Sequence, residues 1–324
     1  MRVLLTGATG FLGKYVIDEL REQGYIITAF GRNEEIGKTL EKENISFFKG
    51  DFTNIDDLYK ASENVEMIVH TGALSTIWGK WEDFYNTNIV GTENVLKICR
   101  EKDIKRLVYI SSPSIYAAPK DQLNISENEA PFENNLNFYI KSKILAEKKI
   151  KEYSDVPTVI LRPRGLFGIG DTSIIPRLLK LNNEKAIPLF DNGEQLIDIT
   201  CVENVALAVR LALESDKAVN NIYNITNGEP KKFKEILDLF FYEMNIEGNY
   251  KNLNYFFTKI IVNILENFYK IFKFQKEPIL TKYTLYLLKY SQTLSIEKAK
   301  QDLNYQPKLT IAEGIKKYVE HSRK

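Results

Sequence analysis

The chain opens with an apolar run that leads directly into three glycines spaced three residues apart, Gly7, Gly10 and Gly13. A strand that turns sharply into a helix favours glycine, because glycine adopts positive φ and has no side chain to block a ligand. The helix that follows would direct unpaired N–H groups and the positive end of its dipole at that ligand. A pyrophosphate fits this environment. The segment therefore predicts a dinucleotide-binding turn, with tight helix–strand packing as the alternative role of the glycines.

Short apolar runs alternate with helical patterns through the first half of the chain. The predicted strands are Val3–Thr6, Ile26–Phe30, Ile45–Phe48, Glu66–Val69, Arg106–Ile110 and Thr158–Leu161. The predicted helices are Lys14–Glu22, Asp56–Ala61, Asp83–Glu101 and Phe138–Tyr153. Near-continuous apolar strands separated by helices are typical of a parallel sheet that is covered on both faces. The pattern predicts a doubly wound α/β fold of the Rossmann type.

The length of 324 residues allows two lobes that each bury a core. Beyond Pro163, glycines and prolines interrupt the alternation before a mostly helical half. We assign residues 1–165 to a dinucleotide-binding domain, to which the chain returns at about 196–245. Residues 166–195 and 246–324 are assigned to a smaller substrate-binding lobe.

Charge and cysteine content limit the classes of partner. Lys and Arg total 44 against 43 Asp and Glu, so the formal net charge of +1 gives no global attraction for nucleic acid or an anionic membrane. We expect a small-molecule partner. Cys99 and Cys201 lie far apart without metal-ligand spacing, which indicates a reducing compartment and no metal site. Met1 leads into a strand pattern and not into a signal segment, so we expect a cytoplasmic protein.

The end of the second predicted strand bears on the choice of cofactor. NAD-binding turns commonly place an acidic residue about 20 positions further on, where it holds the ribose hydroxyls. Here Arg32 lies 19 positions beyond Gly13. A guanidinium suits a 2′-phosphate in geometry and charge, so NADP(H) is favoured. NAD(H) stays open, because Arg32 is also explained as a solvated surface charge and Glu34 lies close by.

A second pattern joins Tyr139 to Lys143, four positions apart and therefore on one face of a predicted helix. A free tyrosine has a pKa of about 10. An adjacent ammonium, helped by the positive nicotinamide of an oxidised cofactor, would lower that pKa and let Tyr139 exchange a proton with a carbonyl or carbinol oxygen. The fifth predicted strand ends in two serines at the ligand edge of the sheet. Ser112 is the candidate hydrogen-bond donor to the substrate oxygen, with Ser111 and Ser114 as alternatives.

Seven motifs occur in the order found in the extended short-chain dehydrogenase/reductases, the NAD-dependent epimerase/dehydratase-like family, and the chain resembles that family over essentially its whole length. The motifs are TGATGFLG with its GxxGxxG spacing, Gly50-Asp51, His70–Ala73, Asn88–Thr92, Ser111-Ser112, Tyr139-x-x-x-Lys143 and Leu161–Pro163. The resemblance implies an NAD(P)-dependent oxidoreductase.

The resemblance also implies roles for individual residues. The implied cofactor-binding residues are Gly7, Thr9, Gly10, Phe11, Leu12, Gly13, Arg32, Asp51, Phe52, Ala73, Tyr139, Lys143 and Pro163. Asp51 would lie beside the adenine, Ala73 in the cofactor groove and Lys143 on the nicotinamide ribose. The implied catalytic residues are Ser112, Tyr139 and Lys143, with Ser112 and Tyr139 flanking the reacting oxygen. Asn88 would support the adjacent helix and an active-site water.

The substrate class is indicated by three further segments. His70–Asn88, Pro163–Asp171 and Glu277–Leu288 resemble the branch that contains 3β-hydroxysteroid dehydrogenases and bacterial 2-alkyl-3-oxoalkanoate reductases. Nucleotide-sugar epimerases and dehydratases usually have a diphosphate-binding arginine in the stretch that here reads Gln195–Thr200, which contains none. We therefore expect ketone–alcohol interconversion on a hydrophobic β-keto lipid or sterol-like substrate.

Two alternatives to this function stay open. One is a nucleotide-sugar epimerase or dehydratase. The other is a non-catalytic NADP-binding regulatory protein, against which the intact serine, tyrosine and lysine count.

The segment Leu253–Phe274 predicts a helix that is rich in Phe, Ile, Leu and Val and carries one narrow polar stripe. The stripe consists of Lys259, Asn263, Glu266, Lys270 and Lys273. These charges argue against a membrane-spanning helix. Three interpretations are open: packing against the helix's own domain or a homodimer partner, the wall of an acyl-chain tunnel, or peripheral contact with a membrane interface.

Overall fold

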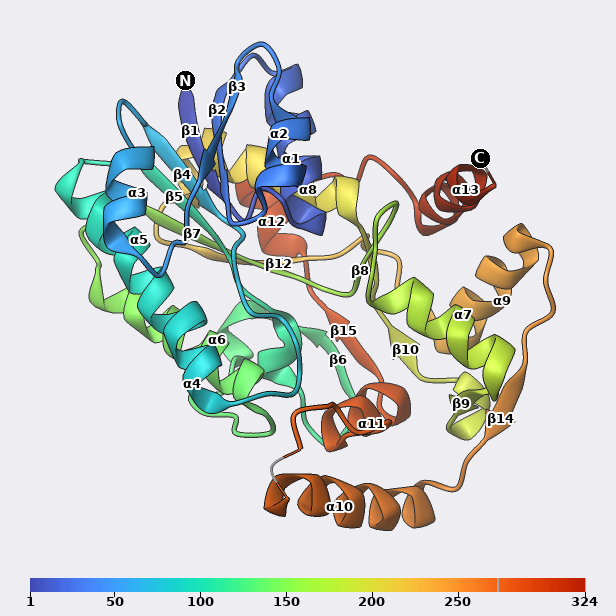
Figure 1. The fold of residues 1–324 in the computed structure, drawn as a ribbon. Helices are drawn as coiled ribbons and strands as arrows, with labels where there is room; N and C mark the ends of the chain where they lie inside the picture. The colour runs from blue at the N-terminus through green and yellow to red at the C-terminus, as the bar shows by residue number, and fades with distance from the viewer. Residues whose placement is uncertain (273, 324) are drawn as a thin grey trace.

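A seven-stranded parallel sheet forms the centre of the molecule in the computed structural model, which describes residues 1–272 and 274–323 (Figure 1). The strand order is β12-β7-β5-β4-β1-β2-β3. The strands are β1 (Arg2–Thr6), β2 (Ile26–Gly31), β3 (Ile45–Lys49), β4 (Met67–His70), β5 (Arg106–Ile110), β7 (Thr158–Pro163) and β12 (Ile222–Ile225). Each strand predicted from the sequence is present within two residues at either end, so the doubly wound α/β fold is confirmed. Only β12, at the sheet edge, was not predicted.

Helices cover both faces of this sheet (Figure 1). One face carries α1 (Phe11–Glu22), α8 (Val202–Glu214) and α12 (Glu297–Leu303), and the other carries α3 (Ile55–Ala61), α5 (Gly91–Glu101) and α6 (Phe138–Glu152). Along β1, Val3 and Leu5 join the first core while Leu4 joins the second, because successive side chains of a strand point to opposite faces. A short helix, α2 (Glu34–Leu40), packs beside β3.

The helix predicted over Asp83–Glu101 consists of three parts. These are α4 (Trp81–Phe84), a π-helical turn over Tyr85–Val90 and α5. Inside the wider turn, the Asn88 amide accepts a hydrogen bond from Leu74 N at 2.7 Å and donates one to Ser142 Oγ at 2.8 Å. Turns of this kind often occur at functional sites. Here the turn ties the loop after β4 to α6.

A smaller lobe lies beside the sheet. The helices outside the two layers that cover the sheet are α7 (Ile174–Glu184), α9 (Phe233–Met244), α10 (Tyr255–Ile271), α11 (Lys282–Lys289) and α13 (Ile311–Ser322). Short strands join it: β8 (Leu166–Phe167) pairs with β11 (Thr200–Cys201), and β9 (Ile187–Leu189) pairs with β14 (Tyr250–Asn252). A four-stranded sheet contains β13 (Lys231–Lys232), β10 (Leu196–Ile197), β15 (Gln292–Leu294) and β6 (Gln122–Ile125). The residue boundaries between the two lobes stay a prediction.

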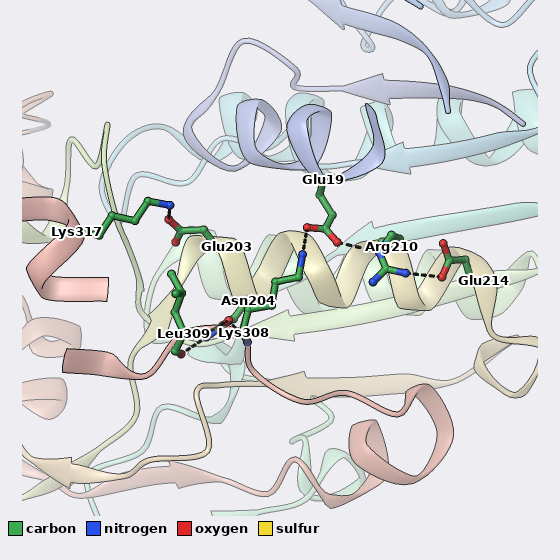
Figure 2. A network of polar contacts seen from close by, with 8 residues as sticks. All are labelled: Glu19, Glu203, Asn204, Arg210, Glu214, Lys308, Leu309 and Lys317. Carbon is green, nitrogen blue, oxygen red and sulfur yellow. Dashed lines mark hydrogen bonds and ion pairs between the residues drawn. The ribbon is translucent and has the colours of Figure 1, made fainter. Parts of the chain in front are cut away.

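A polar network fastens the C-terminal segment to the helices behind the glycine-rich turn (Figure 2). Glu19 of α1 is only 7 % exposed, and its carboxylate accepts hydrogen bonds from Arg210 Nε at 2.8 Å and Lys308 Nζ at 2.5 Å. Asn204 of α8 binds the backbone of Lys308 and Leu309. Since α1 begins at the glycine-rich turn, this network holds α1 and the turn in place.

Helix α10 lies at the periphery, beside α11 (Figure 1). Its buried residues are Val262 and Glu266. Glu266 accepts hydrogen bonds from Lys270 Nζ at 2.6 Å and Lys282 N at 2.8 Å. The outward side chains are 43–74 % exposed, and they are Phe256, Phe257, Ile260, Ile261, Ile264, Phe268 and Ile271.

Helix α10 thus exposes far more apolar surface than an ordinary surface helix does. The interpretation that α10 packs against its own domain holds for one side only, where Val262 joins a cluster with Phe190 and Leu285, while most of its apolar side chains are exposed. Lys273 of the expected polar stripe lies outside the described residues. Among the helices that the structure describes, none has both the length and the apolar character to cross a bilayer.

Candidate active site

The glycine-rich turn joins β1 to α1 and has no room for side chains at two of its positions. Gly7 has φ +73°, and a Cβ there would lie 2.7 Å from Gly72 N. A Cβ at Gly13 would lie 2.4 Å from Gly7 O. Gly10 caps α1, and within the described chain no side chain bonds the N–H groups of the first turn, which also contains no acidic residue. This arrangement fits the pyrophosphate of a dinucleotide.

A cavity of about 1820 Å³ extends from this turn, along the carboxyl ends of the strands, into the smaller lobe. This edge is where open α/β sheets bind ligands. Every residue that the sequence nominated for cofactor binding or catalysis lines this cavity: Gly7, Thr9, Gly10, Phe11, Leu12, Gly13, Arg32, Asp51, Phe52, Ala73, Ser112, Tyr139, Lys143 and Pro163. The structure therefore brings these residues together, while their individual roles stay predictions.

Arg32 and Glu34, on which the choice of cofactor depended, differ in position. The Arg32 side chain lines the cavity, is 76 % exposed, and has Nη1 3.7 Å from Asp51 Oδ2. Glu34 is absent from the described lining of the cavity, and its carboxylate binds Lys49 Nζ at 2.8 Å and Lys38 Nζ at 3.0 Å. Hydrogen bonds from Lys49 and then Lys38 lower the pKa of Glu34 to about 2. Glu34 is thus engaged by two lysines, whereas Arg32 is open to a ligand.

Tyr139 stands in the first turn of α6, which starts after the side chain of Asn137 accepts a hydrogen bond from Ile140 N at 2.8 Å. Burial raises the pKa of Tyr139 to about 12, and the Ser112 hydroxyl acts in the opposite direction. Tyr139 is therefore a neutral phenol at pH 7. Ser112 Oγ donates a hydrogen bond to Ser114 Oγ at 2.8 Å.

Lys143 occupies the next turn of α6 and is 2 % exposed. Its ammonium donates hydrogen bonds to Ile110 O at 2.8 Å and to the Tyr109 hydroxyl at 3.2 Å. Burial lowers the pKa of Lys143 to about 7, and the charge of Glu147 opposes this shift. In the chain alone the pKa of Tyr139 lies above its ordinary value and not below it as the sequence suggested, because burial outweighs the neighbouring groups.

A buried ion pair that the sequence analysis missed holds α6 against the sheet. Glu147 binds Arg162 of β7 through two hydrogen bonds, of 2.9 Å from Nε and 2.5 Å from Nη2. The side chains of Arg162 and Glu147 are only 2 % and 7 % exposed. Ser111 Oγ donates to the same carboxylate at 2.5 Å, so its hydroxyl is engaged. The signal in the sequence is the four-residue spacing, which puts Tyr139, Lys143 and Glu147 on one helix face.

The far end of the cavity is mostly apolar, although Arg177, Lys180 and Glu184 of α7 and the adjacent Lys185 also line it. Its lining there comes from α7, α9, α11 and the loops around them: Ile77, Ile174, Leu178, Ile187, Ile236, Leu237, Phe240, Leu280, Leu287 and Leu288. No residue of α10 contributes to the described lining, so the tunnel-wall interpretation of that helix is wrong. The sequence analysis also missed Arg164 and Arg177, both of which line the cavity.

Comparisons with known proteins agree with this geometry. The model of the NAD dependent epimerase/dehydratase family matches residues 3–226. The chain is 29 % identical over 325 residues to a 2-alkyl-3-oxoalkanoate reductase of Stenotrophomonas maltophilia, with 98 % of each chain covered. It is 29 % identical over 332 residues to the decarboxylating sterol-4-alpha-carboxylate 3-dehydrogenase of Mus musculus, an alignment that covers 98 % of this chain and 91 % of the relative.

A solved structure shows the same fold. The UDP-glucuronic acid 4-epimerase of Bacillus cereus in complex with NAD superimposes with a TM-score of 0.79 over the whole of both chains, at 21 % sequence identity. The chain therefore belongs to the NAD-dependent epimerase/dehydratase family, the extended short-chain dehydrogenase/reductases, and is an NAD(P)-dependent oxidoreductase.

Proposed function

We propose that the protein interconverts a ketone and a secondary alcohol on a hydrophobic β-keto lipid or sterol-like substrate. The observation that carries the proposal is that Tyr139 and Ser112 line one cavity together with the glycine-rich turn and the apolar side chains of α7, α9 and α11. The two relatives at 29 % identity are named for an oxoalkanoate and a sterol carboxylate, which are hydrophobic acids. These names support the proposed substrate class.

The side chains suit proton transfer to a substrate oxygen. A nicotinamide dinucleotide, when bound, supplies or accepts the hydride. The glycine turn would hold its pyrophosphate, Asp51 its adenosine half and Lys143 its nicotinamide ribose. In the reductive direction, the Ser112 hydroxyl would turn from Ser114 to donate a hydrogen bond to the ketone oxygen, and the neutral Tyr139 donates the proton. In the oxidative direction, the phenolate of Tyr139 takes the proton from the alcohol.

Replacing Tyr139 by Phe tests this function. NADPH oxidation is followed with 2-alkyl-3-oxo acids and esters, 3-oxo steroids and UDP- or TDP-sugars, and each assay is repeated with NADH. We expect the wild type to reduce the apolar ketones. Tyr139→Phe should lose about 10²–10⁴-fold in turnover and keep its affinity for NADPH, because only the proton donor is removed. Tyr59→Phe is the matched control, since Tyr59 is exposed on α3.

The other outcomes of this assay decide between functions. Retained turnover in Tyr139→Phe would remove the residue from its proposed role. Conversion of a sugar nucleotide without net change in NADPH would instead indicate an epimerase or dehydratase. Tight NADPH binding with no turnover of any substrate would indicate a regulatory protein.

NADP(H) is the proposed cofactor, with NAD(H) as the alternative. The support is that Arg32 is open to the cavity while two lysines occupy Glu34. Arg32→Asp should weaken NADPH binding at least about tenfold and leave NADH binding unchanged, since only NADPH carries the 2′-phosphate. Arg21→Asp, an exposed change on α1, is the control. Equal losses for both cofactors would contradict the assignment.

We also propose that α10 and the segment after it rest on an anionic lipid surface, from which the substrate enters. Residues 251–290 contain seven lysines and two glutamates. Both glutamates are engaged, Glu266 by Lys270 and Glu277 by Arg177 Nη2 at 2.8 Å. A basic segment around an apolar face complements anionic headgroups.

The segment that follows α10 reaches the cavity. Ile279 is 73 % exposed and lines the cavity as well. Trp78 Nε1 donates a hydrogen bond to Phe274 O at 2.9 Å, and the adjacent Ile77 lines the cavity. We infer that a hydrophobic substrate enters the cavity from the surface beside Ile279.

Sedimentation with lipid vesicles tests the membrane contact. The wild type should sediment with phosphatidylglycerol vesicles, less so as salt is raised, and only weakly with phosphatidylcholine vesicles. The variant Ile261→Glu/Ile264→Glu should lose this binding, whereas Tyr242→Glu, at an exposed site on α9, should keep it. Absence of wild-type binding would overturn the proposal. A dimer that the double variant dissociates would assign the face to a second copy of the chain.

A further inference from the structure

Arg164 follows β7 and lines the cavity, and two hydrogen bonds hold its backbone. Its N–H donates a hydrogen bond to Ile225 O at 3.0 Å, and its carbonyl accepts one from the Thr200 hydroxyl. The next residue, Gly165, turns the chain with φ +51°. Three segments that are distant in sequence thus fix the backbone from which the guanidinium projects.

The guanidinium of Arg164 is buried without a bonded partner. The residue is 8 % exposed and lines the cavity. Among residues 1–272 and 274–323, no hydrogen bond or ion pair reaches its side chain. Arg162 by contrast binds Glu147, and Arg177 binds Glu277. The guanidinium nitrogens are not among the fully buried polar atoms of the described chain that lack a partner, so their N–H groups face the cavity and are available to a ligand.

Two polar side chains, Tyr283 and Asp198, interact electrostatically with Arg164 without a hydrogen bond to its guanidinium in the described chain. Burial lowers the pKa of Arg164, while Tyr283 and then Asp198 act in the opposite direction. Asp198 stands too far away for an ion pair, and its carboxylate accepts a hydrogen bond from Leu294 N at 2.7 Å. Tyr283 interacts electrostatically with Arg164 on one side and with Tyr139 on the other. Arg164 lines the same cavity as Tyr139, and the segments that carry Ser112 and Arg164 follow the adjacent strands β5 and β7.

We propose that Arg164 binds the carboxylate of a β-oxo or β-hydroxy acid and so selects acids over esters and simple ketones. This inference rests on the proposed function and deepens it. In such an acid, the carboxylate is attached to the carbon next to the reacting carbon. A substrate whose oxygen lies at Tyr139 and Ser112 therefore places its carboxylate a short distance away, where a guanidinium can bind both oxygens. The apolar chain then extends into the chamber lined by α7, α9 and α11.

Oxidation of stable 3-hydroxy compounds provides the test. The compounds are a 2-alkyl-3-hydroxy acid, its methyl ester and the secondary alcohol that lacks the carboxylate, each assayed with NADP⁺. The wild type should prefer the acid. Arg164→Met should lower kcat/KM for the acid about 100-fold, mainly through KM, and change the value for the ester less than about threefold. Arg164→Lys should recover part of the loss as a single point charge.

Two controls separate binding from a structural effect. Arg177→Met removes another cavity arginine, one that already has a carboxylate partner, and should leave the preference for the acid intact. Calorimetric titration of the NADP⁺-loaded protein with the 3-hydroxy acid should show the same loss of affinity in Arg164→Met. If the variant loses acid and ester equally, or keeps its affinity for the acid, the inference is overturned.

The failure of the inference is distinguishable from that of the proposed function. If the wild type oxidises acid and ester equally well, only the role of Arg164 fails. If the wild type neither oxidises nor binds any of the three compounds, the proposed function fails together with the inference.

Discussion

The ion pair between Glu147 and Arg162 should contribute more to stability than any surface pair of α6. Removal of one partner of a buried ion pair costs about 3–5 kcal/mol, because the other charge is left buried and unpaired. Both side chains are buried here, and Glu147 accepts three hydrogen bonds, two from Arg162 and one from Ser111. In Glu147→Gln, the amide nitrogen would face N–H groups that now donate hydrogen bonds to the carboxylate, so two donors would oppose each other. We expect the free energy of unfolding to fall by about 3 kcal/mol.

Urea unfolding of matched variants measures this loss. The expected fall in the midpoint is roughly 1 M. Glu152→Gln, on the same helix, removes an exposed pair with Lys149 and should cost less than about 0.5 kcal/mol. The double variant Glu147→Leu/Arg162→Met should recover most of the stability, since apolar replacement of a whole buried pair is often close to neutral. A loss below about 1 kcal/mol in Glu147→Gln, or a double variant no more stable than the single one, would refute this reasoning.

Glu147 also acts on the site through Lys143. Its charge opposes the effect of burial on the lysine pKa, so Glu147→Gln should lower that pKa further below about 7. The pH at which turnover changes with loss of the ammonium should therefore shift downward. A pH profile unchanged from that of the wild type would limit Glu147 to a structural role.

Three further predictions follow from the site. Gly13→Ala should weaken NADPH binding at least about tenfold in a fluorescence titration, because the new Cβ would lie 2.4 Å from Gly7 O; Gly24→Ala, where no atom lies within 4 Å, should not, and unchanged affinity in Gly13→Ala would argue against the cradle. Since the pKa of Tyr139 is raised to about 12, the phenolate needed for oxidation should increase about tenfold per pH unit through neutral pH; a flat oxidation profile would exclude Tyr139 as the base. Burial, and then Lys143, lower the pKa of His70 to about 3. The contribution of the neutral imidazole to the free energy of unfolding is therefore complete above pH 6.5 and is lost as the pH falls toward 3, by roughly 4–5 kcal/mol in the limit. His70→Asn should show a shallower decline in the urea midpoint between pH 6.5 and 4 than the wild type, and an equal decline would contradict the assignment.

The parallel sheet and the glycine turn were predictable because they depend on local signals. Strand residues such as Leu4 and Val108 lie in apolar runs that only a two-sided sheet can bury. The three glycines follow from steric limits on adjacent backbone. The spacing of Tyr139 and Lys143 likewise needs only the helical period. The resemblance to a family added the order of the motifs and the roles that these imply.

The sequence by itself therefore determined the sheet, the dinucleotide turn and the helix face that carries Tyr139 and Lys143. Only the tertiary structure decided that Arg162 is paired and Arg164 is not, since both are arginines in one short apolar stretch. It also decided that α10 turns Glu266 and Val262 inward and most of its other apolar side chains outward. The period of a helix shows that two faces exist, but contacts between segments far apart in the chain decide which face is covered and which charge finds a partner.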